Sequence, residues 1–141
     1  MPVVIDASVA IKWVLEEDGS AAARDLAASE TMMAPELLFL ECANVLAMKV
    51  RRGLLSVADA DEAMAAIQDM GMRSAPSGPH RAMALRIAIA LGQTVYDSLY
   101  LALALAERVS LVTADARFAA AAAREPVYAE RIRLLTPGSG T

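Results

Sequence analysis

Four acidic residues in this sequence stand in strongly apolar surroundings. They are Asp6, Glu41, Asp97 and Asp115, and each is embedded in, or ends, a segment rich in aliphatic or aromatic side chains. A buried carboxylate is costly unless it is paired or bound to a cation. Because four such residues are spread over the whole chain, we expect the fold to gather them into one metal-binding pocket.

Ordinary structural roles are also open to these acids. Asp115 can cap the helix that follows it, Asp97 can complete a capping box with Thr94, and Asp6 can bond its own turn. Glu41 has the weakest structural explanation, since it lies inside a predicted helix on a side where leucine would pack better. An acidic residue at a position where packing favours an apolar one, without an evident compensating contact, is typical of a functional position. The four residues together therefore favour a function.

The chemistry of such a site follows from its donor atoms. Carboxylates without cysteine or histidine partners suit Mg²⁺ or Mn²⁺ and do not suit structural zinc. One or two such cations lower the pKa of a bound water and stabilise charge on a phosphoryl group. Ser8, Asn44 and Thr113 are neutral neighbours of three of the acids and could orient carboxylates or water. Helix capping or core hydrogen bonding are equally open roles for them.

Other chemistries fail because the residues they need are missing. His80 is the only histidine, which excludes a nuclease that works through paired histidines, and Cys42 sits in an apolar helix typical of core packing. No glycine-rich phosphate loop occurs. A phospho-acceptor aspartate would resemble Asp6 at a strand end, but such proteins need a lysine late in the chain, and the lysines here are Lys12 and Lys49.

Strand-like and helix-like segments alternate along the chain. Short β-branched or apolar runs predict strands at residues 3–6, 31–34, 72–75, 110–113 and 132–135. Between them we expect helices, with Ser8 capping one over residues 9–15 and Pro35 at the first turn of another that reaches residue 52. This order predicts an α/β fold, a three-layer α/β/α sandwich with a mainly parallel, roughly five-stranded sheet.

The predicted topology brings the acids to one place. In open parallel sheets, sites form outside the carboxyl ends of the strands. Asp6 and Asp115 each follow a predicted strand, while Asp97 and Glu41 lie in the first and second turns of their helices. Right-handed crossovers would leave both helix starts near the same edge. One cluster at the carboxyl edge is therefore geometrically permitted.

Charge is distributed unevenly. The formal net charge is −4, with 5 basic and 12 acidic side chains in residues 1–70 (net −7) and 8 and 5 in residues 71–141 (net +3). Net acidity argues against a strong non-specific nucleic-acid binder, but a polyanion would favour the second half. Arg117, two residues after Asp115, is the best candidate for a phosphate contact and Arg124 a weaker one, although both could simply solvate helix faces.

The remaining features concern domain and compartment. A chain of 141 residues is long enough for one cored domain, which we expect over residues 1–136, with a mobile tail at 137–141. The longest uncharged stretches, 87–96 and 98–106, are too short to span a bilayer, and no leader pattern opens the sequence. A single cysteine excludes an internal disulfide. We expect a cytoplasmic protein without a membrane partner.

The ordered set of motifs resembles a known family. Val4-Ile5-Asp6-Ala7-Ser8, then Glu41-Cys42-Ala43-Asn44, then Tyr96-Asp97-Ser98-Leu99-Tyr100, then Leu111-Val112-Thr113-Ala114-Asp115 resemble the PIN-domain ribonucleases. Within that group they look most like the VapC toxins of bacterial toxin–antitoxin pairs. Each motif alone is weak, but the set covers essentially the whole chain in order.

The resemblance implies a metal-dependent endoribonuclease. Asp6, Glu41, Asp97 and Asp115 would be the acidic quartet that binds Mg²⁺ or Mn²⁺, with Thr113, Ser8 and Asn44 as polar neighbours. A metal-activated water would cut an RNA phosphodiester and leave a 5′-phosphate and a 3′-hydroxyl. The partners implied are a small VapB-like antitoxin whose C-terminal segment enters the active-site groove, and a second copy of the chain. A homodimer, or a heterotetramer and larger with antitoxin, is expected.

Two other functions stay open at this point. The chain could act chiefly with its antitoxin as a DNA-bound regulatory module, which a folded protein that binds no divalent metal would support. It could instead be a housekeeping PIN nuclease of RNA maturation or decay, although no added RNA-binding domain is evident. The motifs do not encode which RNA is cut, because that choice depends on surface shape and loop contacts.

Overall fold

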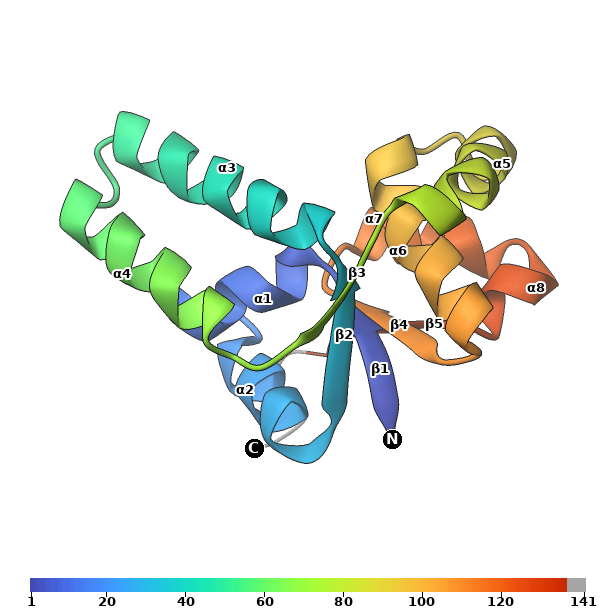
Figure 1. The fold of residues 1–141 in the computed structure, drawn as a ribbon, viewed down its shortest axis with the longest axis horizontal. Helices are drawn as coiled ribbons and strands as arrows, with labels where there is room; N and C mark the ends of the chain where they lie inside the picture. Colours follow the sequence, from blue (N-terminus) through green and yellow to red (C-terminus); the bar gives the residue numbers. More distant parts are fainter. Residues whose placement is uncertain (137–141) are drawn as a thin grey trace.

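The architecture is a parallel sheet between two layers of helices (Figure 1). The computed structural model describes residues 1–136, which form five strands, eight α-helices and one short 3-10 helix. The strands are β1 (Pro2–Ile5), β2 (Thr31–Pro35), β3 (Arg73–Ala75), β4 (Ser110–Thr113) and β5 (Ile132–Leu134). All neighbouring pairs are parallel, in the order β3-β2-β1-β4-β5. The predicted fold class is confirmed.

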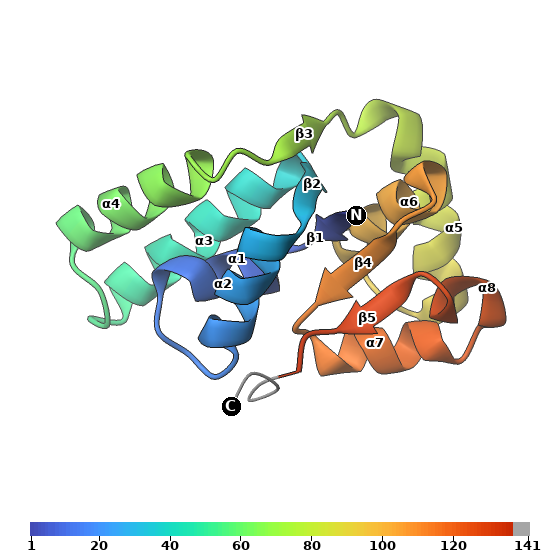
Figure 2. The same ribbon diagram turned by 90° about the horizontal axis from the view of Figure 1, so that it is seen from below.

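The helices are divided between the two faces of the sheet by the direction of the crossovers. The first half contributes α1 (Ala7–Val14), α2 (Ser20–Ser29), α3 (Leu37–Arg51) and α4 (Val57–Gln68). The second half contributes η1 (Gly78–His80), α5 (Arg81–Leu91), α6 (Val95–Glu107), α7 (Ala116–Ala123) and α8 (Pro126–Ala129). Figures 1 and 2 show α1 to α4 on one side and α5 to α8 on the other. The chain reverses direction across the sheet after β3, which moves the later crossovers to the opposite face.

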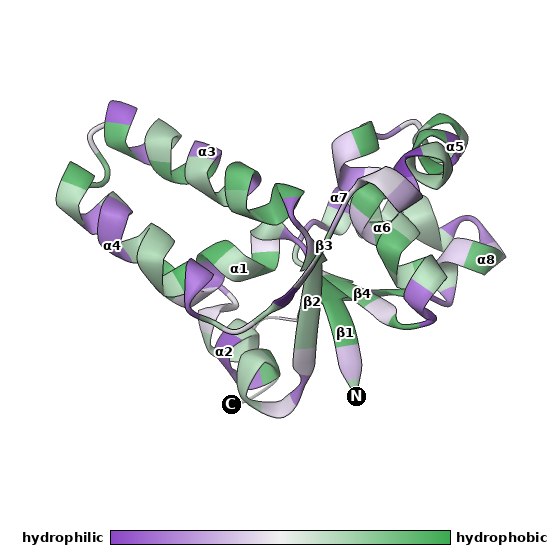
Figure 3. Ribbon diagram, in the orientation of Figure 1, coloured by the Kyte–Doolittle hydropathy of each residue, from purple (hydrophilic) through white to green (hydrophobic). Residues whose placement is uncertain are grey.

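Burial explains why these segments fold as they do. Val3, Val4 and Ile5 are buried, as expected for a central parallel strand covered on both faces. Ser98 to Ala104 in α6 are all buried, and α6 packs against β1, β2 and β4. A helix that is apolar all round belongs in the core. Figure 3 shows hydrophobic colouring on much of α6 and on β4, and also on other helices such as α1 and α5.

Two predicted helix starts are wrong. Asp6, not Ser8, caps α1, because the Asp6 carboxylate accepts from the backbone N–H of Val9 at 3.3 Å, while Ser8 lies inside the first turn. Pro35 is the last residue of β2 and not the first of a helix. The chain stays extended there, since the next backbone N–H, that of Glu36, donates to Ala75 O at 2.9 Å. Proline is tolerated in a sheet where its missing donor is not needed.

The remaining expectations concern helix ends, membrane spans and the tail. Thr94 and Ser56 cap α6 and α4, and Gly92 ends α5 in the left-handed conformation. No single helix among the described residues is long and apolar enough to cross a membrane; α5 (with η1) and α6 meet that test only as a pair, bent by 116°. The tail expected at 137–141 lies outside the described residues.

Candidate active site

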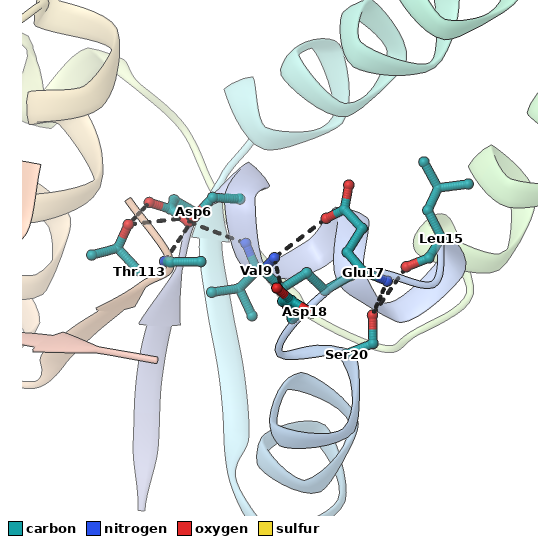
Figure 4. Close-up of polar contacts among 10 residues, drawn as sticks. Asp6, Val9, Leu15, Glu17, Asp18, Ser20 and Thr113 are labelled. Carbon is teal, nitrogen blue, oxygen red and sulfur yellow. Dashed lines mark hydrogen bonds and ion pairs between the residues drawn. The ribbon is translucent and has the colours of Figure 1, made fainter. Parts of the chain in front are cut away.

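Asp6 and Thr113 meet where two adjacent strands end. Ile5 pairs with Val112 in the β1–β4 register, so the residues that follow them emerge side by side at the carboxyl edge. Thr113 Oγ1 donates to Asp6 Oδ2 at 2.5 Å, and Ser8 Oγ donates to Asp6 Oδ1 at 2.5 Å. Figure 4 shows the side chains of Asp6 and Thr113 pointing toward each other across the two strand ends. Both oxygens of the carboxylate are thus held by hydroxyl groups.

Backbone amides fix the direction of those hydroxyl bonds. The N–H of Ala114 donates to Ser8 Oγ at 2.9 Å, and the N–H of Asp115 donates to Thr113 Oγ1 at 3.0 Å. A hydroxyl has one proton to give, and it gives that proton to Asp6 when an amide already occupies its acceptor side. The loop after β4 therefore orients the Asp6 carboxylate through two side chains.

Asp115 and Asp97 lie at the starts of two helices. Asp115 caps α7 by accepting from the backbone N–H groups of Arg117 and Phe118 at 3.0 and 3.1 Å. Asp97 is in the first turn of α6, and its N–H donates to Thr94 Oγ1 at 3.0 Å. A hollow of about 390 Å³ joins the two acids and is lined also by Gly92, Gln93, Thr94 and Arg117. Capping explains the backbone bonds of both acids but leaves their carboxylates facing the same hollow.

Glu41 has a partner that the sequence reading did not single out. The hydroxyl of Tyr100 in α6 donates to Glu41 Oε1 in α3. Tyr100 is buried, and a buried tyrosine hydroxyl normally finds an acceptor. The signal available in the sequence was Tyr100 itself, a tyrosine inside the uncharged and largely apolar run 98–106, one helical turn after Asp97. Its hydroxyl would need an acceptor once buried.

The four acids are close enough to perturb one another electrostatically. Burial raises the pKa of Asp6 to about 6, against its hydrogen bonds with Ser8, Thr113 and Val9, and the charge of Asp97 adds to the rise. Burial also raises the pKa of Glu41, with Asp97 again contributing. The pKa of Asp97 is raised first by burial and then by Asp115. Asp97 therefore stands electrostatically between the other three.

These residues fit a hard divalent cation by donor type and by charge. All the donors are carboxylate or hydroxyl oxygens, and repulsion among the acids is of the kind that a bound cation relieves. Within residues 1–136, however, no group of three or more His, Cys, Asp or Glu side chains is arranged so that it could hold a metal ion. The acids share one neighbourhood without converging on one point.

The other predicted site residues lie around this neighbourhood. Asn44 is exposed on α3, lines a hollow that contains Glu41, and directs its Nδ2 at Met48 Sδ, 4.0 Å away. Arg117 is exposed and lines the hollow shared by Asp97 and Asp115. An adjoining hollow of about 330 Å³ contains Arg117, Gln93 and Arg124. Gln93 is a second residue, besides Tyr100, that sequence reasoning missed; no chemical signal marked it.

Comparison with known proteins agrees with this architecture. PAE2754 from Pyrobaculum aerophilum superposes with a TM-score of 0.70 at 22% identity, over 86% of this chain and 79% of that one. VapBC2 from Rickettsia felis, solved bound to a DNA fragment from its promoter, gives 0.65 at 13% identity, over 96% and 100%. Mycobacterium tuberculosis VapC20, described as a Sarcin-Ricin loop cleaving toxin, gives 0.65 at 15% identity, over 84% and 94%.

Sequence comparison identifies the family. No curated protein sequence gives a significant match to this chain. The family model of the PIN domain, however, matches residues 3–124, which include all four acids and both hydroxyl residues bonded to Asp6. With its fold and its carboxyl-edge acids already described, this chain belongs to the PIN domain family.

Proposed function

We propose that this protein is a metal-dependent endoribonuclease of the VapC toxin type, with residues 1–136 as its catalytic domain. The observation that carries the proposal is the environment of Asp6, a half-buried carboxylate whose pKa is raised to about 6. Both of its oxygens accept hydrogen bonds from hydroxyl groups, and each hydroxyl in turn accepts from a backbone N–H. A structural cap needs only one oxygen and no such support. Structural likeness to VapC20, described as a Sarcin-Ricin loop cleaving toxin, supports the same proposal.

Each side chain then has a role in binding and orientation. Asp6, Glu41, Asp97 and Asp115 would hold Mg²⁺ or Mn²⁺. Ser8 and Thr113 hold the two oxygens of the Asp6 carboxylate in place, and Asn44 lines the hollow that contains Glu41. When bound, the cation supplies an activated water and stabilises charge on the phosphoryl group. The products would be a 5′-phosphate and a 3′-hydroxyl.

The substrate would be held beside the acids by two arginines, one in the first turn of α7 and one at its C-cap. Arg117 lines the same hollow as Asp97 and Asp115, and Arg124 lines the next one. Among the described residues, neither arginine is in an ion pair, so both charges are free to meet phosphate. Net positive charge in residues 71–141 acts in the same direction.

Regulation would come from a VapB-like antitoxin in the cytoplasm, acting on a homodimer or a larger complex. A hollow of about 420 Å³ between α1 and α4 is lined by Trp13, Leu15, Leu55 and Ala63, with Asp59 and Glu62 at its polar side. Apolar walls with an acidic rim suit an amphipathic segment that carries basic residues. The structural likeness to VapBC2 supports a partner of this class.

A second function is favoured by one comparison. The VapBC2 structure was solved with promoter DNA, so a complex of this chain with its antitoxin could act mainly as a DNA-bound regulator. The absence of a preformed three-carboxylate group within residues 1–136 is compatible with that role. A housekeeping role in RNA processing has no observation in its favour beyond the PIN domain itself.

The decisive experiment measures cleavage of a total RNA pool with Mg²⁺, with Mn²⁺ and with chelator. The native protein is compared with Asp6→Asn, and with Asp25→Asn, an exposed aspartate of α2, as the matched control. We expect discrete cuts with 5′-phosphate ends that chelator and Asp6→Asn abolish and Asp25→Asn preserves. Cutting that survives both would reject the metal mechanism. Metal binding without any cutting, together with promoter binding in the antitoxin complex, would support the regulatory alternative.

A further inference from the structure

A separate hollow contains Glu41 and has no arginine in its lining. It measures about 330 Å³ and is lined by Ala7, Leu37, Leu40, Glu41, Asn44, Val45 and Tyr96, a set that we call the Tyr96 hollow. Its walls come from α3, from the first residue of α1 and from the first turn of α6. Apart from Glu41 and Asn44, these side chains are apolar or aromatic. The composition matches small-molecule sites, which combine apolar walls with a few polar groups.

Two of its side chains are unusually exposed for their type. Tyr96 is 63% and Leu40 72% exposed. Each directly precedes one of the proposed catalytic acids in the chain, Asp97 and Glu41. A single exposed apolar residue needs no explanation, but an exposed tyrosine and leucine that share a hollow with a catalytic acid indicate a binding surface.

The two sides of the site differ in charge. Successive helix residues are about 100° apart around the axis, so Tyr96 and Asp97 at the start of α6 face different hollows. The Asp97 side continues to Gln93, Arg117 and Arg124, so two arginines lie beside its acids. The Tyr96 side has no arginine or lysine in its lining. Single-stranded RNA has the same two-sidedness, with a charged backbone and bases that present apolar faces.

From this arrangement, and resting on the proposed nuclease function, we propose that the Tyr96 hollow binds one unpaired nucleobase beside the scissile phosphate. The base stacks on the Tyr96 ring with Leu40 at its margin, and Asn44, which lines the same hollow, supplies an amide for its hydrogen-bonding edge. Neighbouring phosphates lie on the Arg117 side. Because a base can reach the hollow only when it is unstacked, the substrate class is single-stranded RNA in loops or tails, not duplex.

The test uses two strands of equal length and charge. One is oligoadenylate and the other is the same ribose-phosphate chain without bases, both measured by fluorescence anisotropy in chelator so that they stay intact. We expect the native protein to prefer oligoadenylate by about 10-fold, the size of one base-stacking contact. Tyr96→Ala should reduce this preference to less than about 2-fold, and Tyr96→Phe, which keeps the ring, should retain it.

Two further variants serve as controls. Arg117→Gln should weaken both strands alike and lower the salt dependence by about one phosphate contact. Leu54→Ala removes a comparably exposed apolar side chain, 66% exposed, in the turn between α3 and α4, and should change the binding of neither strand. Thermal melting checks that each variant is folded. Because Tyr96 and Leu54 are exposed, we expect their substitution to leave the fold intact.

The outcomes separate this proposal from the proposed function. If the native protein cuts RNA but Tyr96→Ala keeps the full preference for bases, the base site is rejected and the nuclease stands. If Tyr96→Ala changes self-association or antitoxin binding and leaves RNA binding unchanged, the hollow is a protein interface and the proposal is overturned. If the native protein neither binds nor cuts RNA, both proposals fail.

Discussion

The hydroxyl of Tyr100 in α6 donates to the carboxylate of Glu41 in α3, joining helices that approach the carboxyl edge from opposite faces of the sheet. Burial, then the bond to Glu41, keeps the pKa of Tyr100 far above its usual value, so the hydroxyl acts as a donor throughout the pH range of ordinary experiments. The bond uses Glu41 Oε1 and leaves Oε2 for a cation. Tyr100 is therefore a positioning residue for Glu41.

Tyr100→Phe should weaken divalent-cation binding without unfolding the protein. Loss of a hydrogen bond to a charged group corresponds to roughly 1.5 kcal/mol, or about a tenfold change in affinity. Isothermal titration with Mn²⁺ measures the effect, and Tyr128→Phe in α8 removes the same atom away from the acids. Unchanged or tighter Mn²⁺ binding by Tyr100→Phe would show that the bond competes with the cation instead of positioning Glu41.

Asp6→Asn should change stability and activity in opposite directions. At neutral pH the native Asp6 is ionised although its folded pKa is raised from 3.8 to about 6, which costs at most about 3 kcal/mol and less after solvent screening. Asparagine removes that charge and still serves as a helix cap. We expect a higher melting temperature in chelator together with lost cleavage. A destabilised variant would mean that the hydroxyl bonds outweigh the cost of burial.

The same group predicts how stability depends on pH. Between about pH 4 and 6 the folded protein holds a proton on Asp6 that the unfolded chain has released, so the free energy of unfolding falls as pH rises through this window. Denaturant titrations in chelator give the free energy of unfolding of the native protein minus that of Asp6→Asn. This difference should become more negative up to about pH 6 and stay constant above it. A difference that does not vary with pH would place the pKa of Asp6 near its ordinary value.

Thr113→Val should damage both the site and the fold. Thr113 is fully buried, donates to Asp6 and accepts from the Asp115 N–H, so valine leaves that amide without its partner. An unsatisfied buried donor costs about 1–3 kcal/mol. Chemical denaturation measures the loss, and Thr31→Val on the exposed start of β2 is the control, expected to stay within about 0.5 kcal/mol. Equal stability of both variants would show that the two hydrogen bonds of the Thr113 hydroxyl do not stabilise the fold.

Cys42 should be chemically silent in the folded protein. It is fully buried in α3, and burial raises the pKa of its thiol to about 12, with the charges of Glu41 and Asp6 adding to the effect. The thiolate is the reactive form, so labelling should be negligible under native conditions and complete in denaturant. Rapid native labelling by a thiol reagent with loss of RNA cleavage would reopen a nucleophilic role for this residue.

The sequence by itself determined the layout of this protein. Apolar runs separated by capped helices specify the alternation of strands and helices, and Thr94, Ser56 and Gly92 act as local stop and start signals over a few residues. Because parallel strands share one carboxyl edge, the positions of Asp6 and Asp115 after their strands already implied a common neighbourhood. Local signals failed at Ser8 and Pro35. Asp6 takes the capping position expected for Ser8, and pairing in the sheet keeps Pro35 in β2.

Only the tertiary structure decided what surrounds each acid. The bonds of Thr113 to Asp6 and of Tyr100 to Glu41 join residues 107 and 59 positions apart. They depend on the strand register and on how α3 and α6 pack across the sheet, which periodicity does not encode. Hollows are likewise properties of the gaps between elements, so the Tyr96 hollow has no sequence signature of its own. Sequence places residues on elements, whereas packing determines which of them meet.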